Sequence, residues 1–483
     1  MRVTSLVACL SLAVLGGCEE DPVLDPDLEP VSVGFVAPNA TVIPPLADAA
    51  NAFLRVAETA VAEVNARGGI NRRELVLVPR DSGFDPPTRI ANGEFPLATD
   101  IIEVINEYDS LGVVGFVGPV VTATASQAWQ RANELDMPII SPSSTGVDLT
   151  QPLDPDTGVP LEDKFLFRNA TDDRFQGLAM AHFLTNLYDD PATAASPDPV
   201  ECAYILHDND GYGNGFSAAV VELFQEQLGN TLKLVRPLGA EEGCDLACDI
   251  QAVADAPPCD EATPNARRNV ILISFGAAGD TVATWDQMDP RPDILWFLTD
   301  GARTSGFVSS APESIDGVVG TSRTNPVIGD AYEVFEDAYE DRFPEENIAE
   351  TAYTAQVWDG IWLFAAGLTL QEQRNPGGTF GGLGLARAIK DISSGPGVIL
   401  HAGQWRDLLA AVDAGATVDF DGAAGPSDFD NCGETVGPYE IYRVFKNPDT
   451  GQMTSEQIRF LSTAVIQQLR LNFTGLTNAC DPI

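Results

Sequence analysis

Short apolar segments alternate with stretches of helical periodicity along most of this 483-residue chain. An apolar strand that leads into a helix and then into another strand is typical of a parallel sheet with helices on both faces. The first series comprises predicted strands at residues 31–36, 75–78, 113–117 and 138–140 and predicted helices at 53–64, 101–105 and 122–135. The second comprises predicted strands at 202–206, 232–235, 270–274 and 294–298 and predicted helices at 215–228 and 277–288. We therefore predict an α/β protein with two doubly wound, Rossmann-like lobes.

The remaining chain adds further elements to this pattern. Helices are predicted at 331–342, 352–368 and 405–412, a last strand at 439–445 and an added C-terminal helix at 454–471. Residues 150–164 and 239–268 are predicted to be surface insertions. Two wound sheets in one chain leave a crevice where strand ends and helix starts face a common space, so a small ligand is expected there.

The N-terminal residues predict export. Met1 and Arg2 precede an apolar run, residues 3–14, that is too short to remain as a membrane span and has the length of a signal-peptide core. Leu15-Gly16-Gly17-Cys18 resembles a bacterial lipobox, which implies cleavage before Cys18 and lipidation of that residue. The alternative is an ordinary signal peptide with an incidental cysteine. We predict residues 1–17 as the signal and 18–30 as an extended acidic tether.

Six cysteines remain after the signal and Cys18 are set aside. An even number in an exported protein indicates disulfides, and fifteen pairings are open. One arrangement joins Cys244 to Cys248, Cys202 to Cys259 and Cys432 to Cys480. A zinc site at Cys244 and Cys248 is the competing idea, but no histidine lies near them in sequence. We expect no metal and no cofactor.

The net charge of −44 excludes several partners. Such a surface repels nucleic acid and anionic lipid headgroups. A cation-binding surface is one interpretation, but the acidic residues are scattered and lack the spacing of a calcium loop, so we favour a role in solubility.

No motif of a common enzyme class occurs in the chain. A nucleophile elbow, a phosphate-binding loop and a zinc-protease helix are all missing. His207 followed by Asp208 at a predicted strand end is better explained as a polar turn than as a catalytic pair. We predict that the protein is not an enzyme.

Six segments occur in the order seen in a known family. They are VAEVNARGGI (61–70), VVGFVGPVVTATASQA with MPIISPSST (113–128 and 137–145), ILHDNDGYGNG (205–215), WFLTDG (296–301), VWDGIWLFAAGL (357–368) and FDGAAGPSDFDNCG (420–433). Over residues 31–446 the chain resembles type I periplasmic solute-binding proteins of the leucine/isoleucine/valine-binding group. Each segment alone is weak, but all six in order form a specific signature.

The resemblance implies two lobes joined by three hinge crossovers that close on a ligand. Carried onto this sequence, lobe one comprises residues 31–169 and 320–417, lobe two comprises 170–319 and 418–446, and 447–483 form a C-terminal extension. The resemblance also implies an amino acid-like ligand, a periplasmic or cell-envelope location and an ABC permease as partner. Contact with the membrane is expected through the lipid anchor only.

Thr122 is the first candidate for ligand contact. It is predicted to start a helix, where free backbone N–H groups and the helix dipole favour a carboxylate. The resemblance implies the same role, and the alternative is a plain helix cap. The resemblance also places Ser143, Ser144 and Thr145 at the ligand's carboxylate and amino groups, with a polar turn as the alternative.

Three further candidates come from lobe two. The resemblance implies that Tyr212 contacts the ligand, and the alternative is a tyrosine packed on the hinge. Asp300 follows a predicted strand, and a carboxylate in a closing cleft needs a partner such as an ammonium group. Its alternative is a turn cap. Phe275 is a candidate apolar wall, although a core aromatic is the favoured interpretation.

Two departures from the family pattern put the ligand in doubt. Residues 37–45 do not match the glycine-rich family loop, and Val120 and Val121 stand where relatives carry small polar residues. Leucine itself is therefore not implied. A cell-envelope sensor or regulator with the same fold, without transport, is the alternative function.

Overall fold

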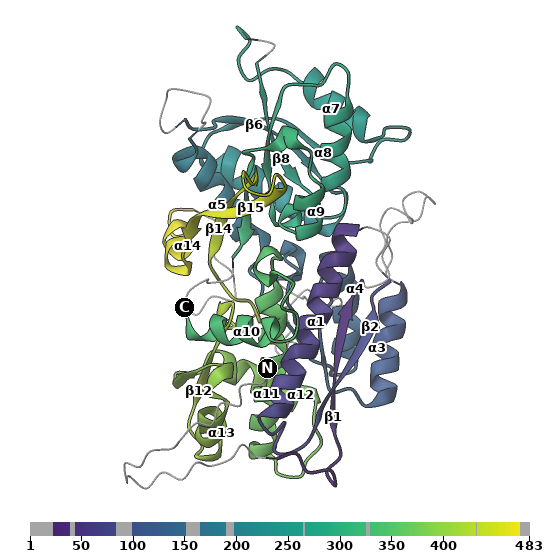
Figure 1. Cartoon of the computed structure of the whole chain (residues 1–483), viewed down its shortest axis with the longest axis vertical. Helices are drawn as coiled ribbons and strands as arrows, with labels where there is room; N and C mark the ends of the chain where they lie inside the picture. Colours follow the sequence, from purple (N-terminus) through teal and green to yellow (C-terminus); the bar gives the residue numbers. More distant parts are fainter. Residues whose placement is uncertain are drawn as a thin grey trace.

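The computed structural model describes residues 23–38, 44–83, 99–150, 165–189, 198–263, 266–324, 329–430 and 432–473. It forms an elongated molecule with one sheet towards each end of the long axis (Figure 1). The predicted signal cleavage site and Cys18 lie outside the described residues.

Lobe one is built on a five-stranded parallel sheet with the order β2-β1-β3-β4-β5. These strands are β1 (Val31–Ala37), β2 (Leu75–Asp81), β3 (Phe116–Val117), β4 (Ile139–Ser141) and β5 (Leu166–Arg168). The helices that connect them are α1 (Pro44–Ala66), α3 (Thr99–Leu111) and α4 (Thr122–Glu134). Strand β1 is almost entirely apolar and is buried on both faces, as in other parallel sheets, whereas the edge strand β2 is only partly buried.

Lobe two contains a seven-stranded sheet with the order β15-β14-β10-β9-β8-β6-β7. Five of its strands are parallel: β6 (Cys202–His207), β7 (Thr231–Pro237), β8 (Arg268–Ile273), β9 (Ile294–Leu298) and β10 (Val319–Arg323). Two antiparallel strands, β14 (Tyr439–Lys446) and β15 (Met453–Leu461), complete one edge. The helices of this lobe are α5 (Asp173–His182), α6 (Gly211–Val220), α7 (Leu246–Asp255), α8 (Ala278–Gln287), α9 (Ser305–Ser310) and α14 (Thr463–Arg470).

A further group of elements packs on lobe one. It comprises α10 (Asp330–Glu340), α11 (Thr354–Arg374), α12 (Gly382–Ser393), α13 (Trp405–Asp413) and a small sheet of β11 (Val398–Leu400), β12 (Val418–Gly422) and β13 (Gly425–Pro426). Helix α11 is buried over most of its length because it is apolar on nearly every face. Trp358 packs on Trp362 and Trp362 on Trp405, which joins α11 to α13 within the core of lobe one.

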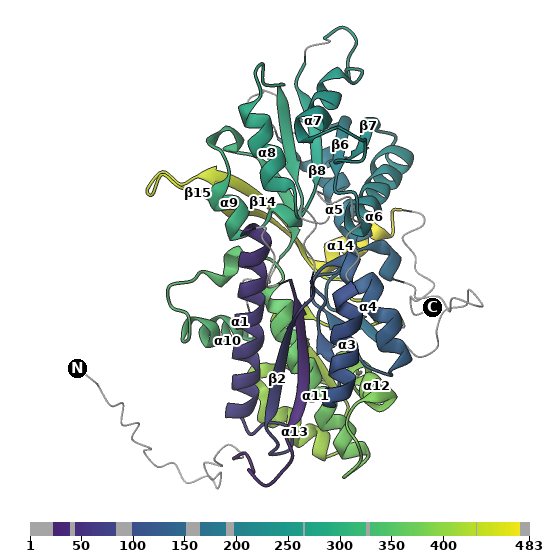
Figure 2. The ribbon, with the colours of Figure 1, turned by 90° about the vertical axis from the view of Figure 1, so that its right-hand side faces the viewer.

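The chain passes between the two lobes three times: after β5, after β10 and before β14 (Figure 2). Arg168, at the end of β5, is fully buried and pairs with Glu434 at 2.6 Å, which ties the first crossover to the third. The predicted α/β class, with two wound lobes and three crossovers, is confirmed. The residue limits assigned to each lobe from the sequence stay a prediction.

The predicted C-terminal helix at 454–471 is wrong. Its first half is β15, which pairs antiparallel with β14, and only α14 at its end is helical. Ser462 separates the two, and its hydroxyl accepts a hydrogen bond from the Val465 backbone as an N-cap. Residues 453–461 therefore form a strand because they pair with the edge of β14. Local periodicity in the sequence cannot predict pairing with a strand of this kind.

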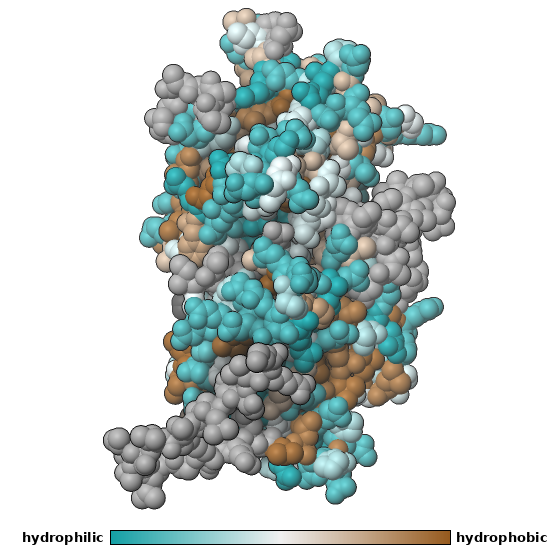
Figure 3. Space-filling view, in the orientation of Figure 1, coloured by the Kyte–Doolittle hydropathy of each residue, from teal (hydrophilic) through white to brown (hydrophobic). Residues whose placement is uncertain are grey.

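Two of the suggested disulfides are present, Cys202–Cys259 and Cys244–Cys248. The suggested Cys432–Cys480 bridge falls outside the described residues. None of the helices in the described ranges has both the length and the apolar character needed to cross a bilayer. Hydrophilic side chains dominate the face in Figure 3, between separate apolar patches.

Candidate ligand-binding site

The carboxyl ends of β3 and β4 carry the lobe-one candidates. Gly118 follows β3 with φ of +110°, and a side chain there would lie 2.3 Å from the Val36 carbonyl, so only glycine fits this turn. Helix α4 then begins at Thr122, as predicted. The Thr122 hydroxyl does not cap the helix but accepts a hydrogen bond from the Gly146 backbone N–H at 3.1 Å.

The three candidates after β4 lie beside this helix start. The Ser143 hydroxyl donates to the Val120 carbonyl at 2.7 Å, and the Ser144 hydroxyl donates to the Pro119 carbonyl at 2.9 Å. The Thr145 carbonyl accepts from the Asp173 N–H at 2.9 Å. These residues therefore build one polar rim with Thr122, although two of their hydroxyls already have protein partners.

Tyr212 and Asp300 meet on lobe two. Tyr212 lies in the first turn of α6, which Asp210 caps by accepting from the Gly213 N–H. The Tyr212 hydroxyl donates to Asp300 Oδ1 at 2.8 Å, and the Tyr353 hydroxyl donates to Asp300 Oδ2 at 2.7 Å. Since Tyr353 immediately precedes α11 of lobe one, the Asp300 carboxylate is held from both lobes.

The sequence interpretation missed Tyr353, Asp173 and Gln176. Asp173 is fully buried at the start of α5, and neither of its carboxylate oxygens has a hydrogen-bond partner. Gln176, one turn further along α5, donates to the Thr321 carbonyl at 2.9 Å, while its own side-chain oxygen is unpartnered. The Asp172-Asp173 doublet, separated from the end of β5 by three residues, was the signal available in the sequence.

Burial changes the acidity of both carboxylates. It raises the pKa of Asp300, while the hydrogen bonds from Tyr353 and Tyr212 lower it. Burial and the nearby negative charge of Asp300 raise the pKa of Asp173 well above its usual range. The Thr145 hydroxyl lies near enough to favour the charged form of Asp173 without making a well-formed hydrogen bond to it.

The two halves of the site are in contact. A Cβ built on Gly211, at the start of α6, would lie 3.3 Å from Thr122 Cγ2. A Cβ on Gly215 would lie 3.5 Å from the Val147 backbone nitrogen. The α4 start in lobe one and the α6 start in lobe two therefore face each other closely, which is a closed arrangement of the lobes.

Phe275 is half-buried and packs against the cores of both lobes. Its backbone N–H donates to Asp208 Oδ2 at 2.8 Å, which fixes the turn after β8. His207 is buried and contacts the Asp208 carbonyl through its ring nitrogen. Neither contact leads to the Asp300 carboxylate.

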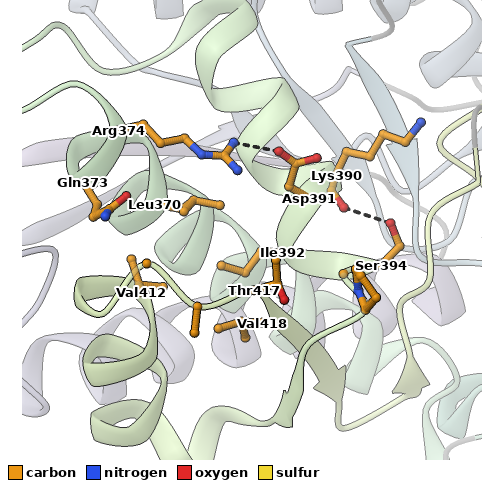
Figure 4. A pocket seen from close by; sticks show the side chains of 14 residues that line it. Leu370, Gln373, Arg374, Lys390, Asp391, Ile392, Ser394, Val412, Thr417 and Val418 are labelled. Atoms are coloured by element: carbon orange, nitrogen blue, oxygen red, sulfur yellow. Dashed lines mark hydrogen bonds and ion pairs between the residues drawn. The ribbon is translucent and has the colours of Figure 1, made fainter.

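A separate cavity of about 400 Å³ lies in lobe one between α11, α12, α13 and β12. At its edge Arg374 pairs with Asp391 at 2.7 Å, and the Ser394 hydroxyl donates to the Lys390 carbonyl (Figure 4). None of the described residues that line it has a buried polar atom without a partner. The cavity therefore offers a ligand fewer buried polar atoms without hydrogen-bond partners than the region around Asp173 and Asp300 does.

No group of three or more His, Cys, Asp or Glu side chains within the described ranges is arranged to hold a metal ion. What the region between the lobes offers is a set of acceptors: the carboxylates of Asp173 and Asp300 and the side-chain oxygen of Gln176. The start of α4 lies close to the start of α6, which carries Tyr212. This arrangement suits a small molecule with donor groups at one end and an anionic group at the other.

Comparison with known proteins gives a family match and similar folds. Residues 30–448 match the model of a family described as "Periplasmic binding protein". The chain is 26% identical over 414 residues to the chemotactic signal transduction system substrate-binding protein BasB of Halobacterium salinarum, which covers 84% of each chain.

Two solved structures have a similar fold. The leucine-binding protein LivK of Thermotoga maritima superimposes with a TM-score of 0.64 at 16% identity, covering 89% of this chain and 98% of LivK. The branched-chain amino acid transporter substrate-binding protein LivJ of Streptococcus pneumoniae, in complex with isoleucine, gives a TM-score of 0.62 at 18% identity and covers 89% of this chain and 99% of LivJ.

Proposed function

Since the chain belongs to the periplasmic binding protein family, we propose that it captures an amino acid or a similar small polar molecule between its two lobes. The resemblance inferred from the six sequence segments is confirmed, and the fold is that of the leucine-binding proteins. Family members are binding proteins of extracytoplasmic compartments rather than enzymes.

The observation that carries the proposal is the position of Asp300. Its buried carboxylate is held by Tyr212 of lobe two and Tyr353 of lobe one, and the Thr122 helix start lies close to the same α6 start. A carboxylate buried in this way suits an ammonium group, and a helix start suits a carboxylate. The pair of subsites therefore has the polarity of an amino acid.

We further propose that the protein is held at the cell envelope by lipidated Cys18 and delivers its ligand to an ABC permease. LivJ, which has a similar fold, is the substrate-binding protein of a branched-chain amino acid transporter, and this supports delivery to a transporter. Sensing is the second candidate, because BasB belongs to a chemotactic signalling system and aligns over most of this chain. Loss of labelled-ligand uptake in a deletion strain supports transport, whereas normal uptake with a lost tactic response supports sensing.

Titration calorimetry of the protein against a panel of amino acids tests the binding proposal. We expect at least one to bind, and we expect Asp300→Ala to weaken that binding about tenfold or more, since a charge-assisted hydrogen bond is worth about 1.5–3 kcal/mol. Glu226→Gln is the matched control, because Glu226 is exposed on the same lobe. Equal binding by the Asp300→Ala variant would place the ligand elsewhere.

A further inference from the structure

The charged groups around Asp173 and Asp300 do not balance. Three neighbouring arginines are neutralised in ion pairs: Arg174 with Asp172 at 2.5 Å, Arg168 with Glu434 at 2.6 Å and Arg303 with Glu440 at 2.8 Å. No ion pair between described residues includes Asp173, Asp300 or Arg323, or the buried Asp359, which interacts electrostatically with Arg323. The carboxyl groups of Asp173, Asp300 and Asp359 therefore outnumber the one guanidinium without an ion pair, in a region with almost no access to solvent.

Arg323 does not neutralise either carboxylate directly. Its Nη1 donates to the Thr171 hydroxyl at 2.7 Å, and its Nε has no partner. Burial lowers the pKa of Arg323, and its nearest charged or ionisable neighbours include Tyr439, Tyr353 and Asp359. It belongs to the same buried region but leaves the excess of carboxylate in place.

Asp173 has no structural task that requires a carboxylate. Helix α5 is capped by Asp172, whose side chain accepts from the Arg174 N–H at 2.8 Å. The backbone N–H of Asp173 donates to Thr145, but that bond does not depend on the side chain. A buried carboxylate without a partner costs several kcal/mol, so a purely structural residue here would more economically be apolar or an amide.

A further unpartnered acceptor atom lies beside Asp173 on α5. The side-chain oxygen of Gln176 lies one helical turn away on the same face of α5. The Gln176 nitrogen donates to the Thr321 carbonyl, and the same side chain interacts with the Asp300 carboxylate and lowers its pKa, which fixes the orientation of the amide. Two carboxylate oxygens and one amide oxygen without donors form a site for a group that carries several N–H donors.

We infer that the ligand is a basic amino acid, with a second cationic group received by Asp173 and Gln176 in addition to the ammonium group at Asp300. This inference rests on the proposed function and narrows its ligand class. A ligand with two cationic groups and one carboxylate adds a net charge of +1 to a region in which buried carboxyl groups outnumber Arg323. A neutral amino acid leaves the carboxyl oxygens of Asp173 and the side-chain oxygen of Gln176 without a cationic partner.

If a cation binds at Asp173, we expect proton release to accompany binding. Burial and Asp300 favour the protonated form of Asp173, and a bound cation favours the ionised form. The groups that face Asp173 from the elements packed around it are Asp172, Arg168, Thr145, Asp300, Tyr212, Tyr353 and Tyr439. Among them only Asp300 combines a carboxyl group with a raised pKa and direct interaction with Asp173.

Titration calorimetry with matched ligands tests the inference. The probes are lysine, ornithine and arginine, compared with leucine and norleucine as uncharged counterparts and with glutamate. We expect a basic amino acid to bind at least tenfold more tightly than norleucine. Repeating the titration in buffers of different ionisation enthalpy, at several pH values, should reveal the proton release.

The variant Asp173→Asn keeps the shape of the side chain and removes its charge. It should lose at least tenfold in affinity for the basic amino acid, retain or gain affinity for norleucine, and abolish the proton release. Glu226→Gln again serves as the control, and the thermal unfolding of each variant establishes that it is folded. If Asp173→Asn does not fold, the relative affinities of the ligands and the proton release of the unaltered protein still test the inference.

The outcomes separate the two proposals. Neutral amino acids that bind as tightly as basic ones would overturn the inference and leave the proposed function standing. Binding of glutamate alone would do the same. If no amino acid of any charge binds, the proposed function itself is wrong.

Discussion

Three buried carboxylates of this protein differ in the partners that hold them. Asp300 accepts from two tyrosine hydroxyls, Asp173 from no group, and Asp359 from the backbone N–H groups of Ala423 and Ala424 at 2.7 and 2.8 Å. Asp359 lies on α11 and anchors the turn between β12 and β13. Its two bonds explain it as a structural residue, whereas Asp173 has no such explanation.

Asp359 should make the stability of the protein depend on pH. Burial raises its pKa to about 8, although the two backbone bonds oppose the shift. In the unfolded chain it ionises near 3.8. Between these values the folded state binds more protons than the unfolded state, so its contribution to the free energy of unfolding declines as pH rises and levels off above about 8.

The measurement is urea unfolding of the protein and of Asp359→Asn from pH 5 to pH 9. We expect the stability of the protein relative to the variant to decrease over this range up to about pH 8. The exposed Asp413→Asn on α13 should show no such trend. A difference that stays constant with pH would show that Asp359 is ionised throughout.

Some residues of the candidate site could be predicted from the sequence and others could not. The strand and loop motifs around Tyr212 and Asp300 led to the prediction that both contact the ligand, which stays a prediction, and the structure brings the two side chains into direct contact. Asp173 and Tyr353 were missed because their importance arises only when lobe one and lobe two meet around Asp300. Burial of this kind depends on packing between distant segments and leaves no local pattern.

At the scale of the elements, the start of α6 contains two glycines with different roles. A Cβ on Gly213 would lie 2.0 Å from the Asp208 carbonyl oxygen, so Gly213 is required for the turn within lobe two. A Cβ on Gly211 meets only Thr122 Cγ2 of lobe one, at 3.3 Å. Gly211 therefore affects the approach of the lobes without being required by the fold of either one.

The variant Gly211→Leu should hinder closure. A larger side chain against Thr122 would hold the start of α6 away from the start of α4. We expect at least tenfold weaker ligand binding by calorimetry with little change in the thermal unfolding of the ligand-free protein.

Gly279→Leu is the control for this substitution, because Gly279 also lies in the first turn of a lobe-two helix but faces Phe307 of its own lobe at 3.9 Å. Unchanged affinity in Gly211→Leu would mean that ligand capture does not need the contact between α4 and α6.

Some helices and strands could be predicted from the local sequence pattern, and others could not. The alternation of β6, α6 and β7 follows directly from apolar strands and helical periodicity. β15 was assigned to a helix because residues 454–461 are mixed in polarity and the unpaired edge of β14 cannot be seen from the sequence. Only the tertiary structure supplies that edge.

At the scale of the whole molecule, packing of the two lobes against each other buries the hydrogen-bond acceptors of Asp173 and Asp300. The crossovers are tied together by Arg168 and Glu434, and Phe275 contacts the cores of both lobes. With a net charge of −44 the protein repels anions at long range and attracts cations, which accords with a cationic ligand.

The central claim is that a small molecule is enclosed between the start of α4 and the Asp300 carboxylate. A crystal structure of the protein with its ligand tests it most directly. We expect the ligand's ammonium group within hydrogen-bond distance of Asp300 and its carboxylate at the backbone N–H groups near Thr122, with the lobes closed as described. Ligand density in the cavity beside Leu370, with none between the lobes, would contradict the account.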